Sequence, residues 1–157
     1  MLGSSFEYIV IRTLPESILF MLAGFLLLNL KIDKIKLLVY GLLLGGIVTV
    51  IRSLPIAYGI HTVLAMMIGG YILTKISKLP LAQVVMATCG IFISLALSEG
   101  IYIGIATGII GISMEILTAT DAMGALYTLP SLVIFIGIVI LMKYFINKIS
   151  AKQSSTK

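Results

Sequence analysis

Four ionisable residues stand at the margins of apolar segments, where pairing between them would create a recognition site. Arg12 and Glu16 are four residues apart, so on a helix they share one face and can pair. Arg52 ends a second apolar segment and Glu99 ends a later one, so these two could pair across helices. Ionisable groups near hydrocarbon are costly unless they are paired, and they raise a functional hypothesis by default. We therefore expect a polar pocket that recognises a small ligand, a peptide or a lipid headgroup.

Two further candidates are a histidine and a glutamate. His61 could act as a proton-sensitive switch, or simply form hydrogen bonds at a helix end. Glu115 follows a glycine-rich apolar segment and counts as a ligand or pairing candidate. The alternative for all these groups is a purely interfacial role, with arginines extending to lipid headgroups and tyrosines forming an aromatic belt. The tyrosines that would rim the pocket are Tyr8, Tyr58, Tyr102 and Tyr127.

Catalytic and metal-binding patterns are missing from the sequence. It has no paired carboxylates, no HExxH motif, no phosphate loop and no serine–lysine arrangement. A hydrolytic pair of His61 and Cys89 is disfavoured because the two residues should lie at different depths in the membrane. A single cysteine also excludes a disulfide or a thiolate metal cluster within one chain. The sequence predicts no enzyme, no cofactor and no metal site.

The composition sets the environment in which these residues act. The chain has 157 residues, of which 60% are hydrophobic and 11% charged, and its mean hydropathy is +1.20. Soluble domains have roughly 45–50% apolar and about 25% charged residues. The net charge of +5 comes from basic residues between apolar segments and forms no stripe of the kind that binds nucleic acid. The predicted fold is an all-α, polytopic transmembrane helical bundle.

Each of the four prolines follows a leucine at the head of an apolar segment, where a proline costs no helical hydrogen bond. We expect helices to begin near Pro15, Pro55, Pro80 and Pro130, and Thr13 with Glu16 fits a capping box. A single transmembrane domain over residues 1–149 would be followed by a polar cytoplasmic tail over residues 150–157. The five predicted full spans cover residues 15–30, 35–51, 59–74, 80–98 and 129–146.

Residues 100–118 are either a membrane-embedded, re-entrant helix or a sixth span. Gly100, Gly104 and Gly108 recur at a spacing of four and predict a face for close helix packing. Gly41 and Gly45 form a second packing motif of the same spacing in another predicted span.

The lysines favour five spans, with the N-terminus outside the cell and the C-terminus in the cytoplasm. With five crossings, every lysine lies in a cytoplasmic turn or at the C-terminal end, as the positive-inside rule requires. A sixth crossing would place the last four lysines outside. The nine lysines are Lys31, Lys34, Lys36, Lys75, Lys78, Lys143, Lys148, Lys152 and Lys157.

Several of these motifs, taken in order, resemble the N-terminal membrane-sensing region of bacterial sensor histidine kinases with a GHKL-type ATP-binding domain. The likeness covers residues 6–147. The chain stops after a short polar tail, so the resemblance implies a sensor without its kinase, with no phosphotransfer activity. The motifs are Thr13-Leu14-Pro15-Glu16, Ile51-Arg52-Ser53-Leu54-Pro55, Gly59-Ile60-His61-Thr62, Lys78-Leu79-Pro80-Leu81 and Glu99.

The leading hypothesis is therefore a non-enzymatic sensing or regulatory protein of the plasma membrane that acts through a separate kinase or another membrane protein. The first alternative is a small substrate-binding membrane subunit of an uptake transporter, which glycine-rich faces and proline-broken helices also suit. The second is a structural assembly subunit that forms a homo-oligomer. The bilayer is a partner in every case.

Overall fold

The computed structural model describes residues 6–53, 60–119 and 121–154, including the side chains of 6–52, 63–119 and 121–149. Every regular element in these ranges is a helix. Four helical stretches are long and apolar enough to cross a membrane, and a shorter apolar helix covers Val63–Ser77. The prediction of an all-helical, membrane-type fold is confirmed at this level. The four stretches are Phe6–Leu27, Lys34–Arg52, Leu81–Ile110 and Ala122–Ile149.

The first stretch differs from its prediction because it continues through Pro15. It consists of α1 (Phe6–Tyr8), a π-helical turn η1 (Ile9–Thr13) and α2 (Leu14–Leu27). In η1 the amide of Leu14 donates to the carbonyl of Ile9, five residues back. The wider turn takes up the irregularity beside a proline that has no amide hydrogen to donate. The predicted capping box is wrong, since Thr13 has helical dihedral angles and caps nothing.

The next three helices lie close to their predicted ranges at their N-terminal ends. Helix α3 is Lys34–Ser53, α4 is Ile60–Ser77 and α5 is Leu81–Ile105. Pro80 immediately precedes α5, as predicted for a proline-led start. Pro55 lies outside the described residues.

Residues 100–118 do not form a separate helix. Helix α5 continues past Glu99 and ends in a π-helical turn, η2 (Ala106–Ile110), followed by Gly111 in the left-handed region at φ 77°. A short helix, α6 (Met114–Thr118), comes next. The first half of the predicted embedded segment is thus the end of the preceding helix.

Two helices complete the chain. Helix α7 (Ala122–Thr128) is capped by the Asp121 carboxylate, which accepts a hydrogen bond from the Gly124 amide at 2.8 Å. Helix α8 (Pro130–Ser154) follows after one residue, so Pro130 does begin a helix as predicted. Its 25 residues span roughly 37 Å at 1.5 Å per residue, more than about 30 Å of hydrocarbon.

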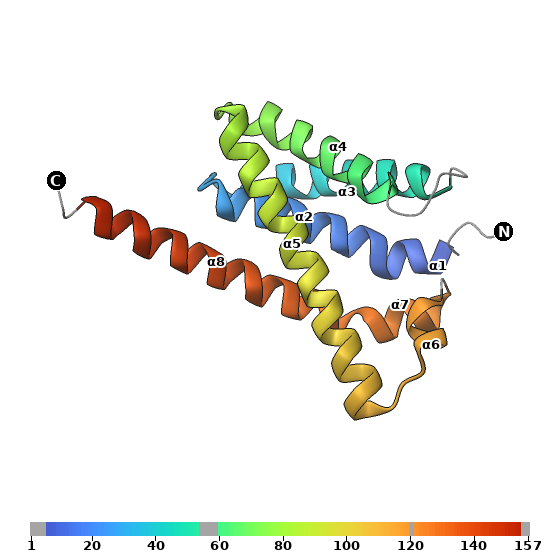
Figure 1. Ribbon diagram of the computed structural model, residues 1–157. Helices are drawn as coiled ribbons and strands as arrows, with labels where there is room; N and C mark the ends of the chain where they lie inside the picture. The colour runs from blue at the N-terminus through green and yellow to red at the C-terminus, as the bar shows by residue number, and fades with distance from the viewer. Residues whose placement is uncertain (1–5, 54–59, 120, 155–157) are drawn as a thin grey trace.

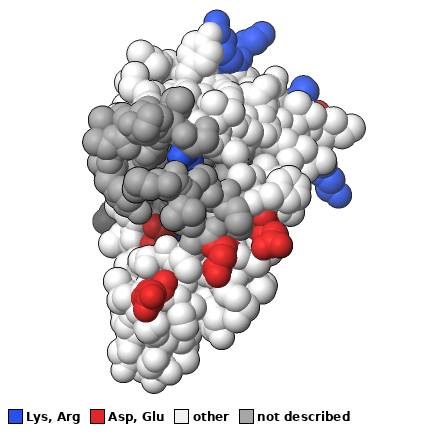
Figure 2. Space-filling model, turned by 90° about the vertical axis from the view of Figure 1, so that its right-hand side faces the viewer, with Lys and Arg blue, Asp and Glu red and all other residues white. Residues whose placement is uncertain are grey.

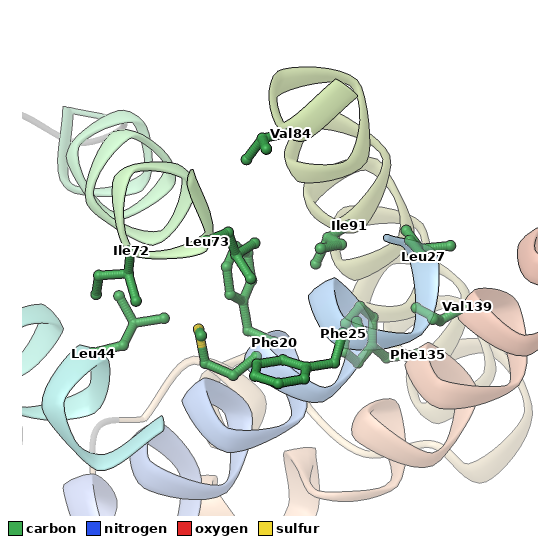
Figure 3. Close-up of a cluster of buried hydrophobic side chains, with 12 residues drawn as sticks. Phe20, Phe25, Leu27, Leu44, Ile72, Leu73, Val84, Ile91, Phe135 and Val139 are labelled. Carbon is green, nitrogen blue, oxygen red and sulfur yellow. The ribbon is translucent and has the colours of Figure 1, made fainter. Parts of the chain in front are cut away.

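Helix α2 is the centre of the core and packs against α3, α5 and α8. Figure 3 shows Phe20 and Phe25 of α2 meeting Leu73 of α4, Ile91 of α5 and Phe135 of α8. Met21, Leu73, Ile91 and Phe135 have no exposed surface. Large apolar side chains on the outside of the bundle, such as Ile35, Met86 and Val133, are about three-quarters exposed. Such an outer surface suits lipid and is unusual for a protein in water.

Glycines allow α2 and α3 to approach closely. A Cβ atom added to Gly41 would lie 2.9 Å from the Cα atom of Ile18, and one added to Gly45 would lie 2.8 Å from a methyl carbon of Leu14. The structure therefore places this predicted motif at a helix contact. At Gly100, Gly104 and Gly108 the described residues make no such contact, because an added Cβ at any of them meets nothing within 4 Å.

Lysines and arginines are separated along the bundle. Figure 1 shows the α2–α3 turn, the α4–α5 turn and the C-terminal end of α8 on the left, whereas α1, α6 and α7 lie on the right. The described lysines belong to the left-hand group, and Lys143 of α8 there donates a hydrogen bond to Asn29 Oδ1 after α2. Figure 2 looks onto the right-hand end and shows acidic side chains on this face, with basic ones mainly at its margins.

Candidate functional site

The Arg12 side chain is buried between three helical segments and is only 4% exposed. Its Nε lies 3.5 Å from Glu16 Oε2, and its NH2 lies 2.5 Å from Glu99 Oε1 on α5. Its NH1 donates to Ser131 Oγ at 3.1 Å and to the carbonyl oxygen of Thr128. Removing a charge from water is tolerated only with this degree of pairing. Arg12 thereby connects the first helical stretch (α1, η1 and α2, hereafter the first helix) to α5 and to the α7–α8 junction.

The α7–α8 junction supplies a carbonyl for Arg12 because the helix is interrupted there. The amide of Leu132 donates to Leu129, which leaves the Thr128 carbonyl outside the helical pattern. Ser131 Oγ donates to this same carbonyl at 2.8 Å. Carbonyl groups at a helix C-terminus are unsatisfied and carry partial negative charge, so a guanidinium is well placed beside them.

Arg52 at the end of α3 completes the cluster. Its NH2 lies 3.7 Å from Glu16 Oε1, and its NH1 donates to Thr13 Oγ1 at 3.2 Å. Glu16 therefore bridges the two arginines. The predicted pair of Arg52 with Glu99 is not formed, because Glu99 contacts Arg12 instead. We call Arg12, Glu16, Arg52 and Glu99 the charged cluster.

The charged cluster has an inner and an outer half. The side chains of Arg12 and Glu16 are 4% and 15% exposed, whereas those of Arg52 and Glu99 are 33% and 42% exposed. With two guanidinium and two carboxylate groups, its net charge is zero. The inner pair fixes the helices, and the outer pair retains surface with which another molecule can interact.

A cavity of about 170 Å³ lies beside the cluster. Glu16, Arg52 and Glu99 form its charged wall, and the rest of the lining is mainly apolar, with contributions from α2, α3, α4, α5 and α8. Phe20 and Phe92, whose ring centroids are 5.2 Å apart in an edge-to-face contact, lie on the apolar side with Phe135. A second, smaller cavity of about 130 Å³ is lined by Arg12 and Glu99 together with Tyr8 and Tyr102.

The remaining predicted site residues lie elsewhere. Glu115 is exposed on α6 and contacts no member of the charged cluster within the described residues. His61 falls in the first turn of α4, and its side chain lies outside the described residues, as does all of Tyr58. Tyr102 is buried and donates its hydroxyl hydrogen to the carbonyl of Tyr127. Tyr102 therefore also holds α5 to the end of α7.

Two contributors to the site, Thr13 and Ser131, were not predicted from the sequence. Thr13 seemed to be a helix cap, yet it is 1% exposed and accepts a hydrogen bond from Arg52. Ser131 follows Pro130 directly, and the interruption that a proline makes in a helix was the available signal for a polar contact there.

In the part of the chain that the structure describes, the regular elements are all helices, four helical stretches are candidate membrane spans, and a partly buried group of paired charges lies between them. Comparison of the chain with protein-family models, with curated proteins and with solved structures finds no match.

Proposed function

We propose that the chain crosses the plasma membrane five times, with its N-terminus outside and its C-terminus in the cytoplasm. The first helix, α3, α4, α5 and α8 run in alternating directions, and the lysine-bearing turns gather at one end (Figure 1). Lysine-rich ends face the cytoplasm in most membrane proteins. Helices α6 and α7, with five and seven residues, are far too short to cross about 30 Å of hydrocarbon, which argues against a sixth span.

On this topology the charged cluster belongs to the outer half of the bundle. We infer that the protein senses a ligand or a membrane state there and passes the change through α8 to a partner in the cytoplasm or membrane. The observation that carries this proposal is the Arg12–Glu99 contact beside the cavity. It joins the first helix to α5, and the same Arg12 side chain also holds the α7–α8 junction. A molecule that competes for Glu99 would therefore loosen α5 from the first helix and let Arg12 move relative to α8. The resemblance to the membrane region of sensor kinases supports the same role.

The proposal predicts that Arg52→Gln and Glu99→Gln each change the output of a genetically linked kinase or regulator by about tenfold, the effect of losing one charge-assisted hydrogen bond. The output would be measured as transcription or phosphorylation in cells that carry each variant. Membrane abundance of each variant would be measured alongside, so that failed insertion is recognised.

Glu115→Gln is the matched control, because it also removes one carboxylate but lies on exposed α6 outside the cluster. Its output should equal that of the wild type. A sensing role is ruled out if the two single variants and their double variant are abundant in the membrane and leave the output unchanged.

The cavity also favours a second candidate, a small substrate-binding membrane subunit of an uptake transporter. A site lined by five helices with a few convergent polar groups suits substrate binding as well as sensing. Uptake of a bound compound that depends on this chain and on a co-expressed ATPase would favour the transporter over the sensor.

A further inference from the structure

Toward the described residues, Glu99 and Arg52 at the 170 Å³ cavity do not use all of their hydrogen-bonding capacity. Glu99 contacts Arg12 through Oε1, and its Oε2 makes no hydrogen bond within the described residues. Among the described residues, Arg52 donates one hydrogen bond, from NH1 to Thr13, while its NH2 is 3.7 Å from Glu16, too far for a hydrogen bond. One wall of the cavity therefore presents an acceptor for a cation and a donor for an anion.

The charge balance restricts what can bind there. The charged cluster is already neutral, so a ligand with a single charge would leave a net charge in a site that is only partly open to water. A zwitterion avoids this cost, since its ammonium group can face Glu99 while its carboxylate faces Arg52. Guanidinium and carboxylate groups match each other well in geometry and bind through two parallel hydrogen bonds.

The rest of the cavity selects an apolar body of limited size. Phe20, Phe92 and Phe135 line it together with Leu44 and Leu95. Its volume of about 170 Å³ lies below the roughly 300–1,000 Å³ of sites for drug-sized ligands. A short aliphatic side chain fits this space, whereas a peptide or a nucleotide does not.

We propose that the cavity binds a small zwitterion with an apolar side chain, the chemical class of an aliphatic α-amino acid. Its carboxylate pairs with Arg52, its ammonium group with Glu99, and its side chain lies against the phenylalanines. This inference rests on the proposed function in that it takes the charged cluster as the sensing site, and it adds the ligand class.

The test is calorimetric titration of the full chain in lipid nanodiscs with four probes. L-leucine carries all three features, 3-methylbutylamine lacks the carboxylate, 4-methylpentanoate lacks the ammonium group, and glycine lacks the side chain. We expect saturable binding of leucine, with each of the other three weaker by about tenfold or more, the equivalent of losing one charge-assisted contact or one buried apolar group.

Titration of single variants shows which residue contacts the carboxylate and which contacts the ammonium group of leucine. Arg52→Gln should remove the advantage of leucine over 3-methylbutylamine, and Glu99→Gln should remove its advantage over 4-methylpentanoate. Glu115→Gln should bind all four probes as the wild type does. Circular dichroism and thermal unfolding of each variant would show that it is folded.

Three results would overturn the ligand class: no saturable binding of leucine, binding of the amine or the acid as tight as that of leucine, or equal losses in Glu115→Gln and Arg52→Gln. A different result would contradict the sensing role. If leucine binds as described while Arg52→Gln and Glu99→Gln leave the cellular output unchanged, the ligand class stands and the sensing role falls. If the two variants change the cellular output but the protein does not bind leucine, the sensing role stands and the ligand class falls.

Discussion

Replacing Arg12 by glutamine is expected to lower the free energy of unfolding by about 3 kcal/mol, the lower end of the effect of breaking a buried ion pair. The lower end applies because Glu99 is 42% exposed and can be hydrated after its partner is lost. Glu16, at 15% exposed, keeps only its longer contact to Arg52. Unfolding in detergent by a denaturing surfactant, followed by circular dichroism, would measure the loss.

Arg52→Gln is the matched control for Arg12→Gln, because it removes the same group from a position that is 33% exposed. Arg52→Gln should lower the free energy of unfolding by less than half as much as Arg12→Gln does. Arg12→Lys should restore little of the stability, since an ammonium group cannot reach Glu16, Glu99 and the α7–α8 junction together. Equal stabilities of the Arg12→Gln variant and the wild type would show that Arg12 does not hold the helices together.

Replacing Gly41 by alanine is expected to cost about 2 kcal/mol, within the range for overpacking a tight contact. The added methyl group would lie 2.9 Å from the Cα atom of Ile18, and backbone cannot rotate away as a side chain can. Helices α2 and α3 must therefore separate. The same unfolding measurement applies to this variant.

Gly46→Ala provides the control, since it lies on the same helix and an added Cβ there meets nothing within 4 Å. Alanine has the higher helix propensity, so Gly46→Ala should be neutral or slightly stabilising. If Gly41→Ala and Gly46→Ala have the same stability, the α2–α3 contact is looser than the structure indicates.

Helix positions could be predicted from the sequence where charge and proline mark their ends. Helix α3 begins at Lys34, and Lys75 lies in the last turn of α4. Pro80 immediately precedes α5, and Pro130 is the first residue of α8. Pro15 has the same local pattern, yet it lies inside a helix because the π-helical turn before it removes the conflict. Arg12 lies in that turn, and its contacts to Glu99 and Ser131 come from distant parts of the chain that no local pattern contains.

The members of the charged cluster could be predicted from the sequence, because unpaired charges near hydrocarbon cost free energy. Which of them pair with one another could not. Paired charges near hydrocarbon pointed to Arg12, Glu16, Arg52 and Glu99. Sequence gives the depth of each residue in a span but not the rotation of one helix against another. That rotation places Glu99 against Arg12, so that Arg52 pairs with Glu16 instead. The same limitation applies to Gly104, where an added Cβ meets nothing within 4 Å among the described residues.

The most direct test of the account is the side of the membrane on which each end of the bundle lies. With Cys89 replaced by serine, single cysteines at Glu7, Glu115, Lys34 or Lys78 would be labelled in intact cells with a membrane-impermeant maleimide. The account predicts that cysteines at Glu7 and Glu115 react at once, whereas those at Lys34 and Lys78 react only after permeabilisation. Labelling at Lys34 and Lys78 in intact cells, with Glu7 and Glu115 protected, would place the charged cluster on the cytoplasmic side and contradict outward sensing.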